Sequence, residues 1–249
     1  MARVAVLRAP GTNCDRETAL ALSEAGAEVH VVRVSDAESG DVDLSAFDGL
    51  VLPGGFSYAD RVRAGAVLAA KLRTSLRREL DELRSRGRPI LGICNGFQVL
   101  VELGLLPGAR CRAALAPNSS GRFEFRWVHV RRAGGCALSS GPEVQAMPVA
   151  HGEGKVVLSD PLCAGDLLSM GLVAYRYSRP DGSPAGGEYP YNPNGSEADI
   201  AGLCSQDGLV MGLMPHPERA VHDWQVPAHL RPAAGLHIFK AFVELASRK

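Results

Sequence analysis

The sequence has no apolar run of the roughly 18 residues that a membrane-spanning helix needs, and its opening MARVAVLRAP is too short an apolar stretch for a signal peptide. An excess of one charge is also absent, because 27 Lys and Arg residues balance 27 Asp and Glu residues. Such a chain has no bulk attraction for nucleic acid or for an anionic membrane. We therefore expect no nucleic-acid partner, no membrane and a cytoplasmic location.

The six cysteines lack the spacing of a zinc site. They lie at positions 14, 94, 111, 136, 163 and 204, without a C-x-x-C pair. A chain of 249 residues is also long enough to build a core without disulfides. We therefore expect no metal and six reduced thiols. Internal repeats and low-complexity tracts are absent too, as is a Walker or other Gly-rich phosphate motif of the usual form.

What is present is the composition of a globular protein, with 46% hydrophobic and 22% charged residues. Short apolar runs at residues 4–7, 29–34, 49–52 and 89–93 predict strands, and helical patterns occupy residues 16–25, 64–84 and 96–103. Gly26 and Gly104 are typical helix-ending residues, and Thr12 with Asp15 resembles a capping box. This alternation predicts an α/β fold with a mostly parallel central sheet flanked by helices.

The second half of the chain has a different pattern. Aromatic and charged residues alternate at residues 123–128, and further apolar runs follow at 156–158 and 172–175, which predicts a smaller antiparallel section. Residues 178–196 contain four prolines and four glycines, which predicts an irregular functional or mobile loop, or else a linker between two domains. Because residues 234–246 are too short for a domain of their own, we expect them to pack back as a helix of a single domain over residues 1–249.

A candidate nucleophile lies in the segment Gly92-Ile93-Cys94-Asn95-Gly96, between an apolar strand and a helix. This is the context of a nucleophile elbow, in which small flanking residues allow close approach and the corner residue projects above the sheet. A thiol at a helix N-terminus is also activated by the helix dipole. The alternative is a buried structural cysteine.

A candidate base lies in the segment Met214-Pro215-His216-Pro217-Glu218. The two prolines favour extended backbone, so the side chains of His216 and Glu218 are expected to point the same way. Glu218 would then orient the imidazole that shuttles the proton of Cys94. The alternative is a turn with a surface ion pair.

The order Cys, His, Glu differs from that of an α/β-hydrolase, in which the acid precedes the histidine. We therefore expect acyl transfer through a thioester, which needs an oxyanion hole. The backbone amide of Asn95 is one natural donor, and Gly54 or Gly55 could bring a second amide to the same rim. The alternative for the two glycines is a tight turn that ends a strand.

Seven segments together resemble one known family. They are GTNCDRE (11–17), LPGGFSYADRVRAGA (52–66), GICNGFQ (92–98), NSSGRFE (118–124), AHGEG (150–154), NPNGS (192–196) and MPHPER (214–219). Their order and spacing resemble the glutaminase component of phosphoribosylformylglycinamidine synthase, a class I glutamine amidotransferase.

The resemblance implies roles for individual residues. Cys94 matches the family nucleophile, His216 its general acid/base and Glu218 the residue that orients the histidine. Gln98 matches a glutamine that contacts the amino-acid end of the substrate. The segment of His151, Gly152 and Glu153 falls where the family binds substrate, mostly through backbone groups. Ala59 departs from the family, which usually has glycine there, so a positive φ would strain this turn.

The resemblance also implies the reaction and its partners. L-Glutamine is hydrolysed to glutamate, and the ammonia passes to a separate large synthetase that makes formylglycinamidine ribonucleotide in purine synthesis. A small bridging subunit is expected as well, with ATP and magnesium on the synthetase and no cofactor on this chain. The segments around Cys14, Asn118 and Asn194 fit structural turns or synthetase contacts. Two alternatives are a class I amidotransferase with a different acceptor and a non-catalytic relative.

Overall fold

The structure, a computed structural model, describes residues 1–108 and 111–248, and its main element is a nine-stranded mixed sheet. The strands run in the order β2-β1-β3-β4-β11-β10-β9-β6-β7. Their bounds are β1 (Arg3–Arg8), β2 (Glu28–Arg33), β3 (Gly49–Leu52), β4 (Ile90–Ile93), β6 (Glu124–Arg132), β7 (Val144–His151), β9 (Val173–Ser178), β10 (Ile200–Cys204) and β11 (Val210–Leu213). Strands β5 (Ala113–Pro117) and β8 (Glu153–Leu158) form a separate antiparallel pair.

The sheet has a parallel part and an antiparallel part. Every pairing from β2 to β11 is parallel, whereas every pairing from β11 to β7 is antiparallel. The four residues of β3, of β4 and of β11 are all buried, as expected of strands that are covered on both faces. The predicted fold class is therefore confirmed.

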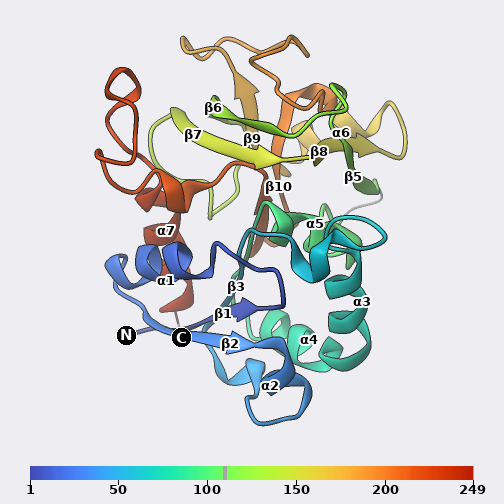
Figure 1. The fold of residues 1–249 in the computed structure, drawn as a ribbon, viewed down its shortest axis with the longest axis vertical. Helices are drawn as coiled ribbons and strands as arrows, with labels where there is room; N and C mark the ends of the chain where they lie inside the picture. The colour runs from blue at the N-terminus through green and yellow to red at the C-terminus, as the bar shows by residue number, and fades with distance from the viewer. Residues whose placement is uncertain (109–110, 249) are drawn as a thin grey trace.

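Helices cover both faces of the parallel part. Figure 1 shows α1 (Asp15–Glu24) and α7 (Leu236–Ala246) on one side of it, and α3 (Ala66–Ser75), α4 (Arg77–Ser85) and α5 (Asn95–Glu102) on the other. Two short helices, α2 (Val34–Glu38) and α6 (Cys163–Ser169), were not predicted. The expected helix at residues 234–246 is α7, and its buried Phe239 and Phe242 anchor it to the core. No helix among the described residues is long and apolar enough to span a membrane.

The long helix predicted for residues 64–84 is interrupted. Leu76, with φ −125° and ψ 17°, separates α3 from α4. From Leu68 to Leu80 the leucines recur every four residues. Each residue turns a helix by about 100°, so each leucine on a straight helix would lie about 40° further around the axis than the one before it. The break at Leu76 changes the direction of the helix, and Leu68 and Leu80 both remain buried in the core.

The predicted capping box is also wrong. The N-cap of α1 is Cys14, which makes no side-chain cap hydrogen bond, and Asp15 is already inside the helix. Thr12 instead accepts a hydrogen bond from the Ala9 amide (3.1 Å), so its hydroxyl serves the turn before the helix. Asp15 forms an ion pair with Arg8 (3.4 Å).

Residues 178–196 connect β9 to β10, which are neighbours in one sheet, so this stretch does not link two sheets. The segment is irregular, as predicted, but buried hydrogen bonds fix it. Asn194 donates to the Gly154 carbonyl (2.8 Å), and the Asp199 carboxylate accepts from the amides of Gly186 and Gly187 (both 2.8 Å). These bonds attach the predicted irregular loop to β8 and to the turn that precedes β10.

Four of the six cysteines form disulfides, Cys111–Cys163 and Cys136–Cys204. The expectation of six reduced thiols is therefore wrong. Each bond joins residues 52 or 68 positions apart, and only the tertiary fold brings these thiols together. Chain length showed that disulfides are not required for a core, but it carries no information about which cysteines meet. Cys14 and Cys94 are free and buried.

Candidate active site

The predicted catalytic residues meet at the carboxyl ends of three adjacent parallel strands. Strands β3, β4 and β11 lie side by side, and Gly54, Cys94 and His216 follow them in turn. In open α/β sheets this edge is where ligands bind. The sheet therefore assembles three segments that are far apart in the sequence.

Cys94 lies at the corner of a strained strand-to-helix turn, with φ 50° and ψ −104°. The two flanking glycines are required by close packing. A Cβ on Gly96 would lie 1.9 Å from the Leu52 carbonyl oxygen, and one on Gly92 would lie 2.6 Å from the Gly96 carbonyl oxygen. Cys94 is also the N-cap of α5, and its Sγ lies 3.7 Å from the Ala150 carbonyl oxygen. The sequence motif thus forms the predicted elbow.

His216 and Glu218 form a buried pair. Nδ1 of His216 lies 2.6 Å from Oε1 of Glu218, and the two residues are only 2% and 1% exposed. The contact was expected, but the reason was partly wrong, because only His216 has extended backbone and Pro217–Arg219 form a short 3-10 turn. That turn folds Glu218 back onto the imidazole. The surface ion pair considered as an alternative is excluded by this burial.

The charge of His216 is set by its neighbours. Burial by itself lowers the pKa of His216, but the Glu218 carboxylate and then the thiols of Cys94 and Cys14 raise it well above its ordinary value of 6.5. The imidazolium form is therefore favoured in the folded protein. Among the described residues, the Nε2 atom of His216 is buried without a hydrogen-bond partner.

Both predicted oxyanion glycines line the same turn. Gly54 packs so closely that a Cβ there would lie 2.8 Å from Cε1 of His216. Gly55 has a φ of 142°, a conformation that favours glycine, and it borders the cavity next to Cys94. Asn95 is the first residue of α5, where a backbone amide has no partner within the helix.

A cavity of about 220 Å³ opens beside Cys94. This volume is below the range of drug-sized pockets and suits a molecule the size of an amino acid. Its walls include four predicted substrate-contacting residues and several others: Gly55, Phe56, Asp60, Ala64, Cys94, Gln98, Phe123, Ala150, His151, Gly152 and Glu153.

The polar side chains that line the cavity are fixed by hydrogen bonds to neighbouring groups. Gln98 is buried, and its amide donates to the Glu153 carbonyl (2.5 Å) and accepts from the Asn95 amide (2.9 Å). His151 pairs with Oδ1 of Asn118 (3.1 Å), and burial followed by the nearby charge of His216 lowers its pKa to about 3. His151 is therefore neutral at physiological pH and fits a wall residue rather than a base.

Sequence reasoning missed Asp60, which lines the cavity. Burial, and then the negative charge of Glu153, raises the pKa of Asp60 to about 6. Asp60 accepts a hydrogen bond from the side chain of Asn95 (3.3 Å). The only signal in the sequence was its position within the segment LPGGFSYADRVRAGA, where the glycines drew attention first.

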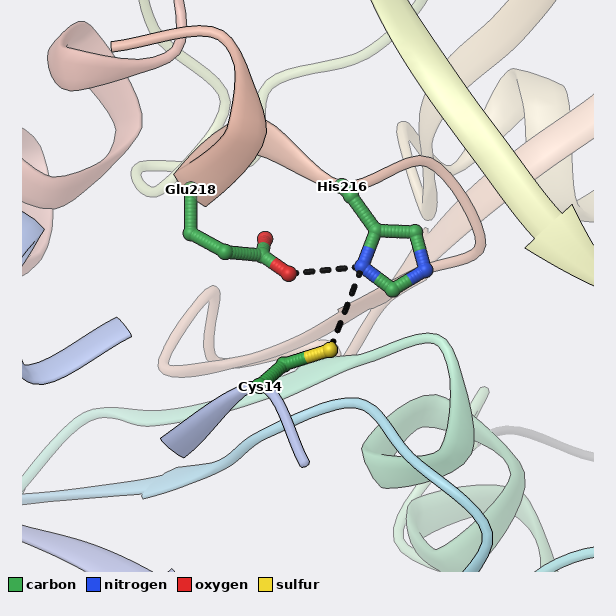
Figure 2. A group of neighbouring side chains, drawn as sticks. All are labelled: Cys14, His216 and Glu218. Carbon is green, nitrogen blue, oxygen red and sulfur yellow. Dashed lines mark hydrogen bonds and ion pairs between the residues drawn. The ribbon is translucent and has the colours of Figure 1, made fainter. Parts of the chain in front are cut away.

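Sequence reasoning also missed the position of Cys14, which Figure 2 shows beside His216 and Glu218. Sγ of Cys14 lies 3.9 Å from Nδ1 of His216 and accepts a hydrogen bond from Arg219 (3.1 Å). These three side chains are of the types that bind metals. The Arg219 cation already lies against the thiol, however, and the short His216–Glu218 bond occupies Nδ1, so the arrangement fits a hydrogen-bonded network better than a metal site.

A strained cysteine elbow, a buried His–Glu pair and an amino-acid-sized cavity lie at this edge of the sheet. A family described as the CobB/CobQ-like glutamine amidotransferase domain matches residues 1–244, so the chain is a glutamine amidotransferase domain. A glutamine amidotransferase from Thermotoga maritima shares the fold at 16% identity, with a TM-score of 0.57 and 99% coverage of both chains.

Proteins with a higher sequence identity to this chain share one name. The phosphoribosylformylglycinamidine synthase subunit PurQ of Pyrococcus furiosus is 43% identical, over 98% of both chains, and that of Methanococcus maripaludis is 40% identical, over 91% of this chain and 85% of its own. A chain in the structure of PurLQS from Thermotoga maritima is 34% identical, with a TM-score of 0.75 over 98% of this chain and 99% of that one. The chain belongs to this PurQ family of glutamine amidotransferases.

Proposed function

We propose that the chain is the glutaminase subunit of phosphoribosylformylglycinamidine synthase and hydrolyses L-glutamine to glutamate and ammonia through a thioester on Cys94. The observation that carries the mechanism is the position of Cys94, at a strained elbow on the wall of a small cavity and close enough to His216 to raise its pKa. Family membership supports the substrate and the pathway, purine biosynthesis.

The reaction begins when the sulfur of Cys94 attacks the side-chain amide carbon of glutamine. His216 holds the proton of the thiol as an imidazolium, which Glu218 stabilises, and gives it to the departing nitrogen, so the C–N bond breaks and ammonia leaves. His216 then takes a proton from water, which attacks the thioester. The C–S bond breaks, glutamate is released and the proton returns to Cys94.

Each tetrahedral intermediate carries a negative oxygen that needs donors. The proposed donors are the backbone amides of Gly55, which borders the cavity, and of Asn95, which directly follows Cys94, while Gly54 shapes the turn against His216. We assign the donor role to Gly55 rather than Gly54 because Gly55 borders the cavity, whereas Gly54 is packed against the imidazole.

Two carboxylates suit the amino-acid end of glutamine. Asp60 and Glu153 both line the cavity, and the charge of Glu153 raises the pKa of Asp60, so a bound cation would relieve their mutual repulsion. We assign them the α-ammonium group of the substrate. Gln98 fixes this part of the cavity by bonding the backbone of Glu153 and the side chain of Asn95.

The partners follow from the relatives. The similar Thermotoga maritima chain belongs to a structure of PurLQS, which supports assembly with a separate large synthetase and a small bridging subunit. We place ATP and magnesium on the synthetase, no cofactor on this chain, and the complex in the cytoplasm. The synthetase consumes the ammonia to make formylglycinamidine ribonucleotide.

The test is Cys94→Ala in the reconstituted complex. Loss of the sulfur abolishes product formation from glutamine, while product formation from added ammonia continues because the synthetase site is intact. Cys136→Ser, which changes a disulfide cysteine, is the matched control and retains glutamine-dependent turnover in the folded fraction. Full glutamine-dependent turnover by Cys94→Ala would refute the assignment.

Partner dependence is tested by glutamate release. The isolated chain is expected to be a poor glutaminase that becomes active when the synthetase carries nucleotide and acceptor, because ammonia without an acceptor is wasted. Misplacing one oxyanion donor costs roughly 3 kcal/mol, or about 10²-fold in rate, which suffices for control. Equal rates with and without the loaded partner would rule this out.

A further inference from the structure

Cys14 lies at the active site without a part in the chemistry proposed above. It is the N-cap of α1 and is only 1% exposed. Its thiol lies 3.9 Å from Nδ1 of His216, on the side of the imidazole that bonds Glu218 (Figure 2). Cys14 is therefore a neighbour of the catalytic base that neither lines the cavity nor faces the substrate.

Cys14 contacts the oxyanion turn through its backbone. Its amide donates to the Gly54 carbonyl (3.2 Å), and the Asn13 amide reaches the same oxygen (3.4 Å). The packing is tight, because a Cβ on Gly54 would lie 3.1 Å from Sγ of Cys14 and 2.8 Å from Cε1 of His216. The Gly54 turn therefore packs directly against both the thiol of Cys14 and the imidazole of His216.

Arg219 connects Cys14 to the turn that carries the base. Its guanidinium donates to Sγ of Cys14 (3.1 Å) and pairs with Glu17 of α1 (3.6 Å). Because Arg219 directly follows Glu218, this link ties the start of α1 to the segment that holds both members of the His–Glu pair. Burial raises the pKa of the Cys14 thiol, so Cys14 is a neutral hydrogen-bonding group rather than a second nucleophile.

We propose that Cys14 is a positioning residue of the glutaminase reaction. Its amide holds the Gly54 turn and its thiol, bonded to Arg219, holds the segment of His216 and Glu218, so one residue sets the distance between the oxyanion donors and the base. This inference rests on the proposed function. It concerns the rate of the chemical step and leaves glutamine binding alone, because Cys14 does not line the cavity.

Two substitutions of nearly equal size test it in the assembled complex. Cys14→Ala removes the acceptor for Arg219, whereas Cys14→Ser keeps an oxygen that can accept the same hydrogen bond. We expect Cys14→Ala to lower kcat for glutamine about 3- to 10-fold, the range of one hydrogen bond, with KM within twofold of wild type. Cys14→Ser should recover most of this loss, and ammonia-dependent turnover should not change in either variant.

A double-mutant cycle separates positioning from packing. Arg219→Ala should lower kcat like Cys14→Ala, and adding it to Cys14→Ala should cause little further loss, because the two act through one bond. Leu22→Ala, a buried change in the same helix, is the control that lowers stability without changing kcat.

The outcomes are distinct. A wild-type kcat in Cys14→Ala would overturn the positioning role. Equal losses of kcat in Cys14→Ala and Cys14→Ser, if they also add to the loss in Arg219→Ala, would overturn it too. The proposed function is tested by a different variant, because glutamine-dependent activity in Cys94→Ala would overturn that function.

Discussion

Nδ1 of His216 and Oε1 of Glu218 are 2.6 Å apart, and almost no solvent reaches either group. A buried carboxylate at this distance favours the charged imidazole over the neutral one. In the proposed mechanism, the pair therefore stores the proton that the departing ammonia requires. Its geometry leads to the first of four predictions.

His216→Ala should reduce glutamine-dependent kcat by about 10²- to 10⁴-fold, because it removes the proton shuttle. Glu218→Gln should reduce it less, because the amide still accepts one hydrogen bond. The Glu218→Gln change also removes the charge that raises the pKa of His216. The imidazolium is therefore lost at a lower pH, and the fall of the rate at alkaline pH should begin at a lower pH. Steady-state pH profiles of folded variants measure both effects. His30→Ala, on β2, is the control, and near wild-type turnover by His216→Ala would require another base.

Asp60→Asn should change stability and substrate affinity in opposite directions. The folded-state pKa of Asp60 is raised from 3.8 to about 6, so this group destabilises the folded protein increasingly as pH rises from about 4 through 6. An asparagine removes that effect, and the gain in unfolding free energy should be absent below pH 4 and complete above pH 6. KM for glutamine should rise, because a carboxylate for the ammonium group is lost.

Chemical denaturation at pH 4 and at pH 7, together with KM at pH 7, provides the measurement for Asp60. Asp81→Asn, on the exposed face of α4, is the matched control and should show neither change. A pH-independent stability difference in Asp60→Asn would contradict the raised pKa.

Ala59→Gly should stabilise the protein. The structure gives Ala59 a φ of 57°, which bears out the strain expected where the family has glycine. Relief of about 1–2 kcal/mol of left-handed strain outweighs the roughly 0.4–1 kcal/mol of added freedom in the unfolded chain, leaving a net gain of up to about 1.6 kcal/mol. Ala70→Gly in α3 is the opposite control and should cost about 1 kcal/mol. Urea unfolding measures both, and a loss of stability in Ala59→Gly would exclude the strain.

Reduction of the disulfides should lower the melting temperature. In the chain-entropy model, closing loops of 52 and 68 residues stabilises by about 4 kcal/mol each, or on the order of 10 °C per bond in a domain of this size. Calorimetry with and without reductant measures the shift. Thiol titration in denaturant should count two thiols before reduction and six after it. Six thiols in the untreated protein would disprove both bonds.

The parts of the site that the sequence predicted are those encoded locally. Cys94 is flanked by glycines within two residues on each side, and Glu218 lies two residues from His216, so spacing alone indicated both arrangements. The strand and helix alternation likewise predicted four of the five strands of the parallel part, because each element has its own periodicity. The fifth strand, β11, and the short helix α2 were not predicted, and the helix predicted for residues 64–84 is broken at Leu76.

The parts that were missed depend on contacts between distant segments. Cys14 and His216 are 202 positions apart, and the disulfides join residues 52 and 68 positions apart. Such pairings follow from sheet order and strand register, which a single sequence does not reveal. Asp60 was missed for a related reason, since its environment is created by Glu153 from another part of the chain.

The position of β11 in the sheet has a consequence for folding during translation. This strand lies in the interior of the sheet between β4 and β10, although it is the last strand in the chain. While the protein is being translated, the sheet therefore has a gap at its centre until residues 210–213 leave the ribosome, and His216 arrives only after them. The elbow of Cys94 is made more than a hundred residues earlier. A nascent chain thus carries the proposed nucleophile long before the proposed base, and the proposed mechanism cannot operate until residues 214–218 have been translated.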